Sequence, residues 1–302
     1  MDPRIVFMGT PEFAVESLDA LVKSGFNVVG VVTAPDKPAG RGMKLTTSAV
    51  KQYAQQHSLH ILQPVKLKDP EFLAALKSLN ADLQVVVAFR MLPEVVWNMP
   101  PLGTINVHAS LLPKYRGAAP INWAIINGEK ESGVTTFKLS HEIDTGNLLL
   151  QQKVTIEEDD DAGALHDKLK VIGAELLVKT VKGLINNEIV EMPQRGDEVS
   201  HAPKLFTDTC RIDWNKPAQQ IHQLIKGLSP YPAAFTTLNG KNFKIYKSAV
   251  SAGEGSGIPG EHDTDHRTYL RFRAADGYVY AKEVQLEGKK KMPIEDFLKG
   301  FR

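Results

Sequence analysis

Three polar side chains in two separated stretches have the chemistry needed to transfer a small acyl group. Asn106 and His108 lie in the run from Ile105 to Pro120, and Asp144 begins an Asp-Thr-Gly sequence. They supply an amide, an imidazole and a carboxylate, with no nucleophilic serine or cysteine among the three. Such a set can stabilise a developing oxyanion and move protons while an outside amine attacks directly, without a covalent enzyme intermediate.

The spacing of the first two residues gives a reason to group them. Residues 103–108 are predicted to form a strand, and side chains two positions apart on a strand point to the same face, so Asn106 and His108 can converge on one substrate atom. Asp144 follows a different apolar run and joins them only if the fold lays the two strands side by side. Each residue also has an ordinary structural interpretation: a turn cap for Asn106, a hydrogen-bonded core histidine for His108, and the start of a turn for Asp144.

Short apolar runs alternate with helical patterns through the first part of the chain. We expect strands at 4–8, 28–33, 83–88 and 103–108, and helices at 46–56, 70–79 and 162–185. Strands separated by helices predict an α/β fold with a Rossmann-like, mostly parallel sheet covered on both faces. Ligands of such sheets bind beyond the carboxyl ends of the strands, where His108 would lie.

The chain is long enough for two domains. We expect a catalytic domain over 1–188, a linker over 189–208, where the helical periodicity lapses, and a C-terminal domain over 209–302. One helical pattern at 217–226 is followed by short β-rich runs at 234–238, 243–250, 269–273 and 278–284. Several short strands at close spacing predict a small β-barrel, similar to an OB-fold.

The cysteine content and the length of the apolar runs indicate the cellular compartment of the protein. Cys210 is the single cysteine, which excludes an intramolecular disulfide and a cysteine-based metal cluster. The start Met-Asp-Pro-Arg is not followed by an apolar run of signal-peptide type, and the longest apolar stretches are too short to cross a bilayer. We therefore expect a cytoplasmic protein with no membrane association.

The charge is unevenly distributed. Residues 209–302 carry a surplus of five positive charges, whereas residues 1–208 carry a surplus of four negative charges. The cations of the C-terminal part include Lys289, Lys290 and Lys291, which could contact a phosphate backbone, although surface lysines are more often simply solvated. A Pro- and Gly-rich basic loop over 35–44 follows the second predicted strand, at the same edge as the catalytic residues, where it suits an RNA end.

Several common site types are excluded. Gly9 follows the first strand, but the second and third glycines of a dinucleotide-binding loop are missing, and Pro11 and Glu12 occupy the place where a pyrophosphate would approach. The sequence has no Gly-x-Ser-x-Gly elbow, no Walker loop and no His-Glu-x-x-His. The acidic run 159–161 precedes a helical pattern and is interpreted as a helix start, so we expect no metal site.

At these residues the sequence resembles the methionyl-tRNA formyltransferase family over nearly the whole chain. The matching segments are Val6 to Phe13, Pro35 to Gly42, Asn106 to Pro120, Asp144 to Gly146, Arg211 to Trp214 and Gly288 to Met292. The single motifs are weak, but their order is highly specific. The resemblance implies formyl transfer from 10-formyltetrahydrofolate to the amino group of initiator methionyl-tRNA, with no metal and no obligate protein partner.

The resemblance also implies a role for each matching residue. Asn106, His108 and Asp144 would carry the catalysis. Our own hypothesis for their roles is that Asn106 and His108 donate to the oxyanion, while Asp144 accepts the amine's proton, through water, and holds the His108 tautomer. The folate would contact Ser110, Leu111, Leu112, Pro113, Phe89, Arg90, Met91 and Leu92. The tRNA would contact Lys37, Arg41, Lys44, Lys289, Lys290 and Lys291.

One segment departs from the family pattern. Where relatives commonly have Ala-Tyr-Gly before a proline, this chain has Ala88-Phe89-Arg90-Met91-Leu92 and is shorter by one residue. The main chain could still contact the pterin there. Two other functions stay open: a formyltransferase that acts on a sugar nucleotide, and a catalytically silent RNA-binding protein. Oligomeric state and the discrimination of initiator tRNA are not encoded in a recognisable pattern.

Overall fold

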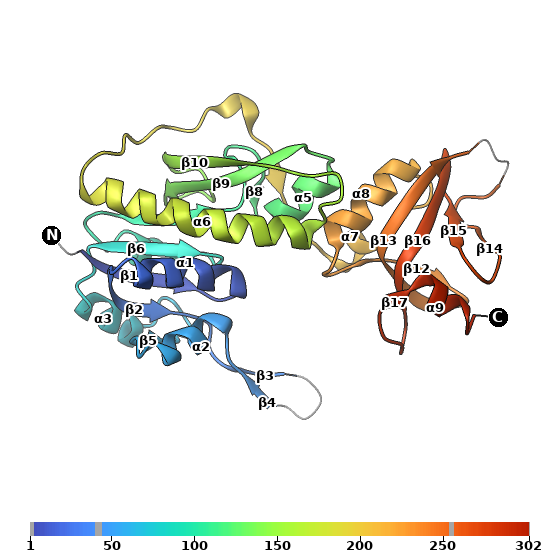
Figure 1. Cartoon of the computed structure of the whole chain (residues 1–302). Helices are drawn as coiled ribbons and strands as arrows, with labels where there is room; N and C mark the ends of the chain where they lie inside the picture. The colour runs from blue at the N-terminus through green and yellow to red at the C-terminus, as the bar shows by residue number, and fades with distance from the viewer. Residues whose placement is uncertain (1–2, 40–43, 254–256, 302) are drawn as a thin grey trace. The chain divides into compact units, whose positions relative to one another are not determined.

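A computed structural model describes residues 3–39, 44–253 and 257–301. Its contacts divide the chain into two compact units (Figure 1). One unit holds residues 1–117, 132–154 and 166–201, and the other holds 118–131, 155–165 and 202–302. The expected boundaries at 188 and 208 were drawn from the sequence pattern alone and stay a prediction.

The first unit is built on a seven-stranded sheet with the order β10-β9-β7-β6-β1-β2-β5. Strands β1, β2, β5, β6 and β7 are parallel, and β9 runs antiparallel to β7. The mostly parallel sheet was therefore predicted correctly. The strands are β1 (Arg4–Gly9), β2 (Asn27–Val32), β5 (Ile61–Leu62), β6 (Leu83–Val87), β7 (Thr104–His108), β9 (Glu131–Lys138) and β10 (Leu148–Thr155).

Helices flank this sheet, and two smaller ribbons are added to it. The helices are α1 (Glu12–Lys23), α2 (Ala49–Gln56), α3 (Pro70–Ser78), α4 (Glu94–Trp97) and α6 (Ala162–Ile185). The ribbons consist of β3 (Lys37–Ala39) with β4 (Lys44–Thr46), and of β8 (Arg116–Gly117) with β11 (His201–Ala202). A short 3₁₀ helix, η1, spans Gly196–Glu198.

The two faces of the sheet are covered by different helices. On one face Phe72 and Leu76 of α3 pack with Val6, Met8 and Val86 of the strands. Asn106 pairs with Val86 in the strand register, so Asn106 and His108 project from this same face. On the other face α6 approaches β7 closely at Gly173, where an added Cβ would lie 3.3 Å from a Val107 methyl carbon.

The second unit carries an antiparallel curled sheet that forms half a barrel. Its order is β12-β13-β16-β15-β14, with β17 added beside β16. The strands are β12 (Ala234–Leu238), β13 (Lys241–Ala252), β14 (His262–Thr264), β15 (Leu270–Arg273), β16 (Gly277–Leu286) and β17 (Met292–Pro293), and the helices are α5 (Pro120–Ile126), α7 (Thr207–Cys210), α8 (Ala218–Leu228) and α9 (Ile294–Leu298). Trp214 and Phe272 stack at 4.7 Å in its core.

One expectation needs correction. The helix expected from residue 46 begins at Ala49, because Ser48 caps it by accepting the Lys51 amide at 3.0 Å and residues 44–46 form a strand. The segment 189–208, expected to be a linker, carries η1 and β11. Among the described residues, no helix combines the length and the apolar character that spanning a bilayer requires.

Candidate active site

His108 and Asp144 lie close together at the carboxyl end of β7, of which His108 is the last residue. The Nδ1 atom of His108 lies 3.8 Å from the Oδ2 atom of Asp144, and both side chains are largely buried. Strand β9 runs back along β7, with Thr135 opposite His108 in the register, and the chain after β9 then turns through Asp144. This antiparallel return brings together two residues that are far apart in the sequence.

The backbone carbonyl of Tyr115 sets the tautomer of His108. The Nε2 atom of His108 lies 2.9 Å from this carbonyl oxygen, which can only accept, so Nε2 carries the hydrogen. Nδ1 is therefore the nitrogen that faces Asp144. The expectation that Asp144 holds the tautomer is wrong, because 3.8 Å exceeds hydrogen-bond distance and the opposite ring nitrogen is already engaged.

Asp144 is held from its backbone and from its carboxylate. Its Oδ2 atom accepts the Gly117 amide at 2.8 Å, while its own carbonyl accepts the Gln194 side-chain amide at 2.8 Å. Its φ of 55° lies in the left-handed region, which is uncommon for a residue other than glycine. Strain of this kind persists only when the surroundings fix the backbone, and it marks functional positions.

Asn106 shares a sheet face with His108 and is only partly buried. Its Oδ1 atom is enclosed and has no hydrogen-bond partner in the described ranges. An enclosed acceptor without a partner costs roughly 1–3 kcal/mol. Phe137, opposite Asn106 in the register and edge-on to the His108 ring at 6.4 Å, forms an apolar wall beside the pair.

A buried hydroxyl organises the turn that follows His108. The Oγ1 atom of Thr135 donates to the Ser110 carbonyl at 2.6 Å and accepts from the Leu112 amide at 3.1 Å and from the Gln151 amide at 3.0 Å. Ser110 and Leu112 are buried, Leu111 is partly exposed, and the peptide bond from Leu112 to Pro113 is cis. The turn that resembles a folate contact therefore has a fixed backbone.

The segment 89–92 lies beyond the end of β6 and is also anchored. The Arg90 guanidinium donates to the carbonyls of Val65, at 2.8 Å, and Pro64, while burial lowers the pKa of Arg90. Leu92 packs in the core beneath the sheet face that bears Asn106, with Phe89 at the border of that core. Met91 is exposed, which leaves it and the main chain available to a ligand.

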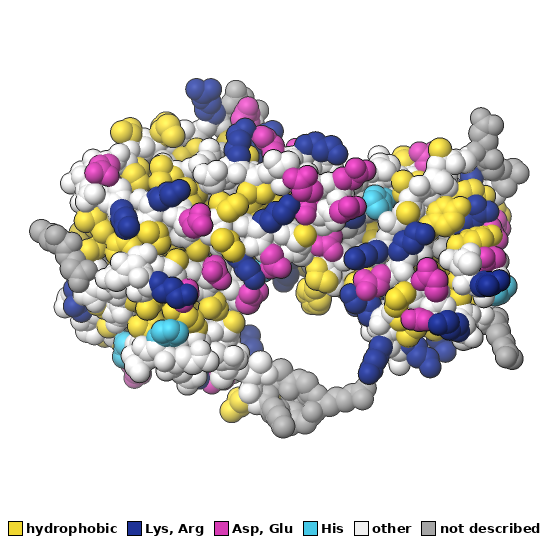
Figure 2. All heavy atoms as spheres, in the orientation of Figure 1, with side chains coloured by type: hydrophobic (Ala, Val, Ile, Leu, Met, Phe, Trp, Pro, Cys, Tyr) yellow, Lys and Arg dark blue, Asp and Glu magenta, His cyan; other side chains and the backbone are white. Residues whose placement is uncertain are grey.

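The expected tRNA contacts are distributed over both units. Lys37 is exposed on β3, and Lys289, Lys290 and Lys291 are exposed before β17. Lys291 lies 3.1 Å from Glu283 and over the Tyr246 ring at 5.1 Å, so its charge is partly engaged. Arg41 lies outside the described residues, as does the side chain of Lys44. Figure 2 shows several lysine and arginine side chains toward the lower edge of the part that carries β12 to β17.

The base of the basic loop is tied to the sheet. Asp36 accepts the Lys51 ammonium at 2.5 Å and the Gln63 amide at 2.9 Å. These two donors, Lys51 first, hold the pKa of Asp36 below its ordinary value. The loop expected to overhang the catalytic edge thus starts from a fixed point, and the strand β3 within it pairs with β4.

Sequence reasoning missed the residues that hold the catalytic groups. Tyr115 and Gly117 act through their backbone, and Gln194 and Ser200 come from the segment expected to be a linker. The glycine at 117, with φ of 120°, was the one available signal, since it implies a special backbone beside the Asn106 motif. Backbone contacts and a side chain from a non-periodic segment leave no further pattern to find.

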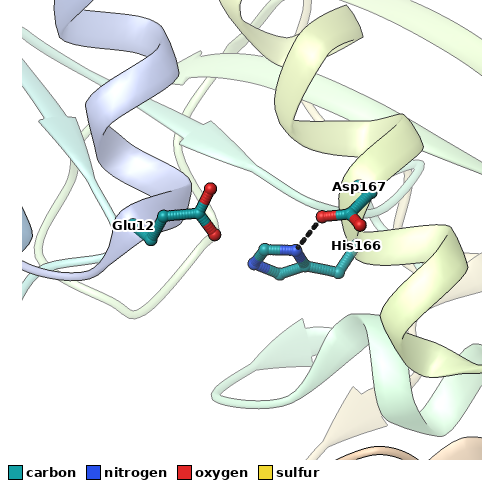
Figure 3. Close-up of side chains that lie close together, drawn as sticks. All are labelled: Glu12, His166 and Asp167. Carbon is teal, nitrogen blue, oxygen red and sulfur yellow. Dashed lines mark hydrogen bonds and ion pairs between the residues drawn. The ribbon is translucent and has the colours of Figure 1, made fainter.

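A second polar cluster has potential metal-ligand atoms within reach of one another. Figure 3 shows Glu12 of α1 pointing toward His166 and Asp167 of α6. Lys170, however, lies 2.8 Å from Glu12 and 3.0 Å from Asp167, and these carboxylates raise the pKa of Lys170. The ammonium supplies the positive charge that the carboxylates need, so the cluster is an ion-pair network between two helices.

Comparison with known proteins places this geometry in a family. Residues 3–181 match the family model described as formyl transferase, and residues 204–302 match the one described as formyl transferase, C-terminal domain. The methionyl-tRNA formyltransferase of Parabacteroides distasonis is 54% identical over 312 residues, which cover 100% of this chain and 96% of that protein. The protein of the same name from Bacteroides fragilis is 52% identical, with 99% and 95% covered.

Solved structures share the fold at lower identity. An N-formyltransferase from Helicobacter canadensis, in complex with folinic acid and dTDP-3-aminofucose, has a TM-score of 0.68 and 24% identity, with 92% of this chain and 98% of that chain covered. HypX from Aquifex aeolicus, in complex with tetrahydrofolic acid, has a TM-score of 0.67 and 18% identity, with 99% and 48% covered. These likenesses support the fold.

Proposed function

The chain belongs to the methionyl-tRNA formyltransferase family, and from this premise we propose how its residues carry out the reaction. The reaction moves a formyl group from 10-formyltetrahydrofolate to the free amino group of methionine on initiator tRNA, which gives N-formylmethionyl-tRNA. The observation that carries the residue assignment is the approach of His108 Nδ1 to Asp144 Oδ2 at 3.8 Å, at the carboxyl end of the strand that bears Asn106.

The residues around the site fit the folate donor. The anchored turn 110–113 and the segment 89–92 both lie beyond carboxyl ends of parallel strands, where ligands of such sheets bind. We assign the folate contacts to Ser110, Leu111, Leu112, Pro113, Phe89, Arg90, Met91 and Leu92, with buried Leu92 acting through its main chain.

Asn106 and His108 stabilise the oxygen anion that forms when the amine attacks the formyl carbon. Asn106 donates through Nδ2, and His108 donates from Nδ1, because its Nε2 hydrogen is committed to the Tyr115 carbonyl. Nδ1 faces the Asp144 carboxylate at 3.8 Å, so a hydrogen on Nδ1 would lie beside a negative charge.

Asp144 moves the proton that the attack releases. Its carboxylate takes the proton from the amine nitrogen, through one bridging water, and the proton is returned to the departing nitrogen of tetrahydrofolate as the old C–N bond breaks. The Gly117 amide, 2.8 Å from Oδ2, orients the carboxylate for this step. No covalent intermediate with the protein is needed, in keeping with a site built from an amide, an imidazole and a carboxylate.

The positively charged residues hold the tRNA. We propose that Lys37, Arg41 and Lys44 contact its acceptor end, and that Lys289, Lys290 and Lys291 contact the phosphate backbone from the C-terminal domain, residues 209–302. Exposure of Lys37 and of the three C-terminal lysines supports this assignment. A tRNA substrate also implies a cytoplasmic location.

A substrate comparison tests the function. Purified protein is incubated with 10-formyltetrahydrofolate and either charged methionyl-tRNA or an amino-sugar nucleotide, and formylated product is measured. We expect formylation of the tRNA alone, since the full-length relatives at 52–54% identity are methionyl-tRNA formyltransferases. Transfer to the sugar nucleotide alone would overturn the proposal, and no folate turnover with either acceptor would favour a silent RNA-binding protein.

A further inference from the structure

Gln194 lies in the segment 189–208, which was expected to be a linker. Its side chain contacts both of the segments that hold the catalytic residues. Gln194 is partly buried, whereas its neighbours from Glu191 to Gly196 are exposed. Its Nε2 donates to the carbonyls of Asp144, at 2.8 Å, and Gly146, at 2.9 Å. Its Oε1 accepts Nε and Nη2 of Arg116, at 3.1 Å and 2.6 Å. The amide therefore uses its full hydrogen-bonding capacity.

The two segments that Gln194 joins are the two that hold the catalytic pair. The segment 115–117 gives the carbonyl that binds His108 Nε2 and the amide that binds the Asp144 carboxylate. The turn 144–146 carries Asp144 itself. It rests against the end of β9, since an added Cβ at Gly146 would lie 1.6 Å from the Lys138 carbonyl oxygen. A shift of either segment would change the distance between His108 and Asp144.

Ser200, six residues after Gln194, also holds the segment 115–117. Its Oγ accepts the Tyr115 amide at 2.9 Å, and its carbonyl accepts the Arg116 amide at 2.9 Å. Tyr115 has a φ of 60°, an unfavourable backbone for a bulky residue, which must be maintained by contacts of this kind. Gln194 and Ser200 thus bracket a short stretch of chain that is pinned to the active site at both ends.

We propose that Gln194 and Ser200 are positioning residues for formyl transfer, and that the segment 194–200 is a structural part of the active site. Gln194 sets the turn that carries Asp144, and Ser200 sets the carbonyl that orients His108. Neither side chain touches the reacting groups. The inference rests on the proposed roles of His108 and Asp144. It adds that the segment 194–200 keeps these two residues at their observed distance from each other.

Gln194→Glu provides a nearly isosteric test. The carboxylate keeps the contact with Arg116 but turns an oxygen toward two carbonyl oxygens, so the Asp144 turn loses both donors. We expect kcat to fall roughly 10- to 100-fold, because small misplacements of catalytic groups cost rates of this order. The KM values for folate and methionyl-tRNA should change by less than about twofold, because uniform binding is left intact. Gln152→Glu, the same change at an exposed glutamine of β10, is the control and should match wild type.

Ser200→Ala removes only the side-chain acceptor of the Tyr115 amide, so we expect a smaller fall in kcat with the same unchanged KM values. If Gln194→Glu does not fold, the kcat of Ser200→Ala alone tests the positioning role. A positioning role also predicts non-additivity: in an Asp144→Asn background, measured by single turnover with excess enzyme, Gln194→Glu should cost much less than in wild type.

Three results would overturn the inference. They are wild-type kcat in both variants, a loss of kcat fully explained by the unfolded fraction in thermal melting, or an unchanged cost of Gln194→Glu in the Asp144→Asn background. The proposed function fails separately. If Asp144→Asn retains wild-type kcat, the catalytic assignment is wrong, whereas an inactive Asp144→Asn beside a fully active Gln194→Glu removes only the positioning role.

Discussion

The polar residues at the catalytic edge of the first sheet are buried and fixed, whereas those of the lysine hairpin are exposed. The lysine hairpin is the turn between β16 and β17 that carries Lys289, Lys290 and Lys291. His108 and Asp144 are nearly enclosed, and each is held by a backbone group of the segment 115–117. Lys289 and Lys290 are exposed. Bond-making needs groups held within a fraction of an ångström, whereas contact with a phosphate backbone depends on charge and tolerates motion. Substitutions at the catalytic edge should therefore lower kcat, whereas substitutions in the lysine hairpin should lower the affinity for tRNA.

The largest expected effect is that of Asp144→Asn. The change keeps the size of the side chain but removes the proton acceptor and the charge beside His108, so kcat should fall by roughly 10³-fold or more. The affinity for tRNA should stay at the wild-type value, because the carboxylate is largely buried. Glu175→Gln, which removes an exposed carboxylate from α6, is the control for charge. A comparable loss of tRNA affinity in Asp144→Asn would erase the contrast between the regions.

Asn106→Ala should have the next largest effect. Loss of one oxyanion donor lowers the rate by roughly 10²- to 10³-fold. The protein itself should be little destabilised, because the Oδ1 atom of Asn106 has no partner to lose within the described ranges. Rate and thermal melting are measured together, with Asn186→Ala at an exposed position as the control. A large drop in melting temperature would instead assign Asn106 a structural role.

Substitutions in the lysine hairpin should weaken the binding of tRNA and leave kcat unchanged. Replacement of Lys289, Lys290 and Lys291 by alanine should make the salt dependence of tRNA affinity less steep by about 2–3 logarithmic units per decade of salt, since each phosphate contact contributes about 0.7–0.9. Among single variants, Lys291→Ala should have the smallest effect, because its ammonium is engaged by Glu283 at 3.1 Å.

The kcat of this triple variant at saturating tRNA should be that of wild type. The matched control replaces Lys66, Lys68 and Lys77, which are equally exposed but belong to the first unit. If the control triple lowered the salt slope as much, the C-terminal hairpin would have no special part in tRNA binding.

The smallest expected effect concerns His222, a partly buried histidine of α8 in the C-terminal unit. It packs on β13 with Nδ1 2.8 Å from Ser248 Oγ, and burial, with the nearby Lys226 charge, lowers the pKa of His222 below 6.5. The unfolded chain takes up this proton first, so the stability due to the neutral ring is present at neutral pH and is lost as the pH falls below about 6.5. Between about pH 7 and pH 5, His222→Gln should lose less stability than wild type. His60→Gln, at an exposed histidine, should follow the wild-type curve, and parallel curves for all three proteins would contradict the prediction.

Much of this arrangement follows from local pattern. The alternation of strands and helices predicted the parallel sheet, and the two-residue spacing of Asn106 and His108 placed them on one face, as the register with Val86 and Phe137 confirms. The position of Asp144 depends on the antiparallel pairing of β9 with β7, a long-range contact that no local pattern encodes. The order of motifs, through family resemblance, linked Asp144 to the pair.

Other parts could not be predicted for identifiable reasons. Gln194 lies in a non-periodic, mostly exposed segment, so neither its inward orientation nor its four hydrogen bonds leaves a trace in the sequence. The tautomer of His108 depends on the Tyr115 backbone, which any residue type could provide. Residues 118–131 and 155–165 belong to the compact unit of the C-terminal strands, a distribution that a linear division of the chain could not show.

The most direct test of the account is a double-mutant cycle on the catalytic pair. Single-turnover formylation of methionyl-tRNA is measured with excess wild-type, His108→Gln, Asp144→Asn and doubly substituted enzyme. If the two groups act on one formyl carbon as a coupled pair, the double variant should be about as slow as the slower single variant. A double variant slowed by the full product of the two single effects would show that His108 and Asp144 act independently, and would contradict the account.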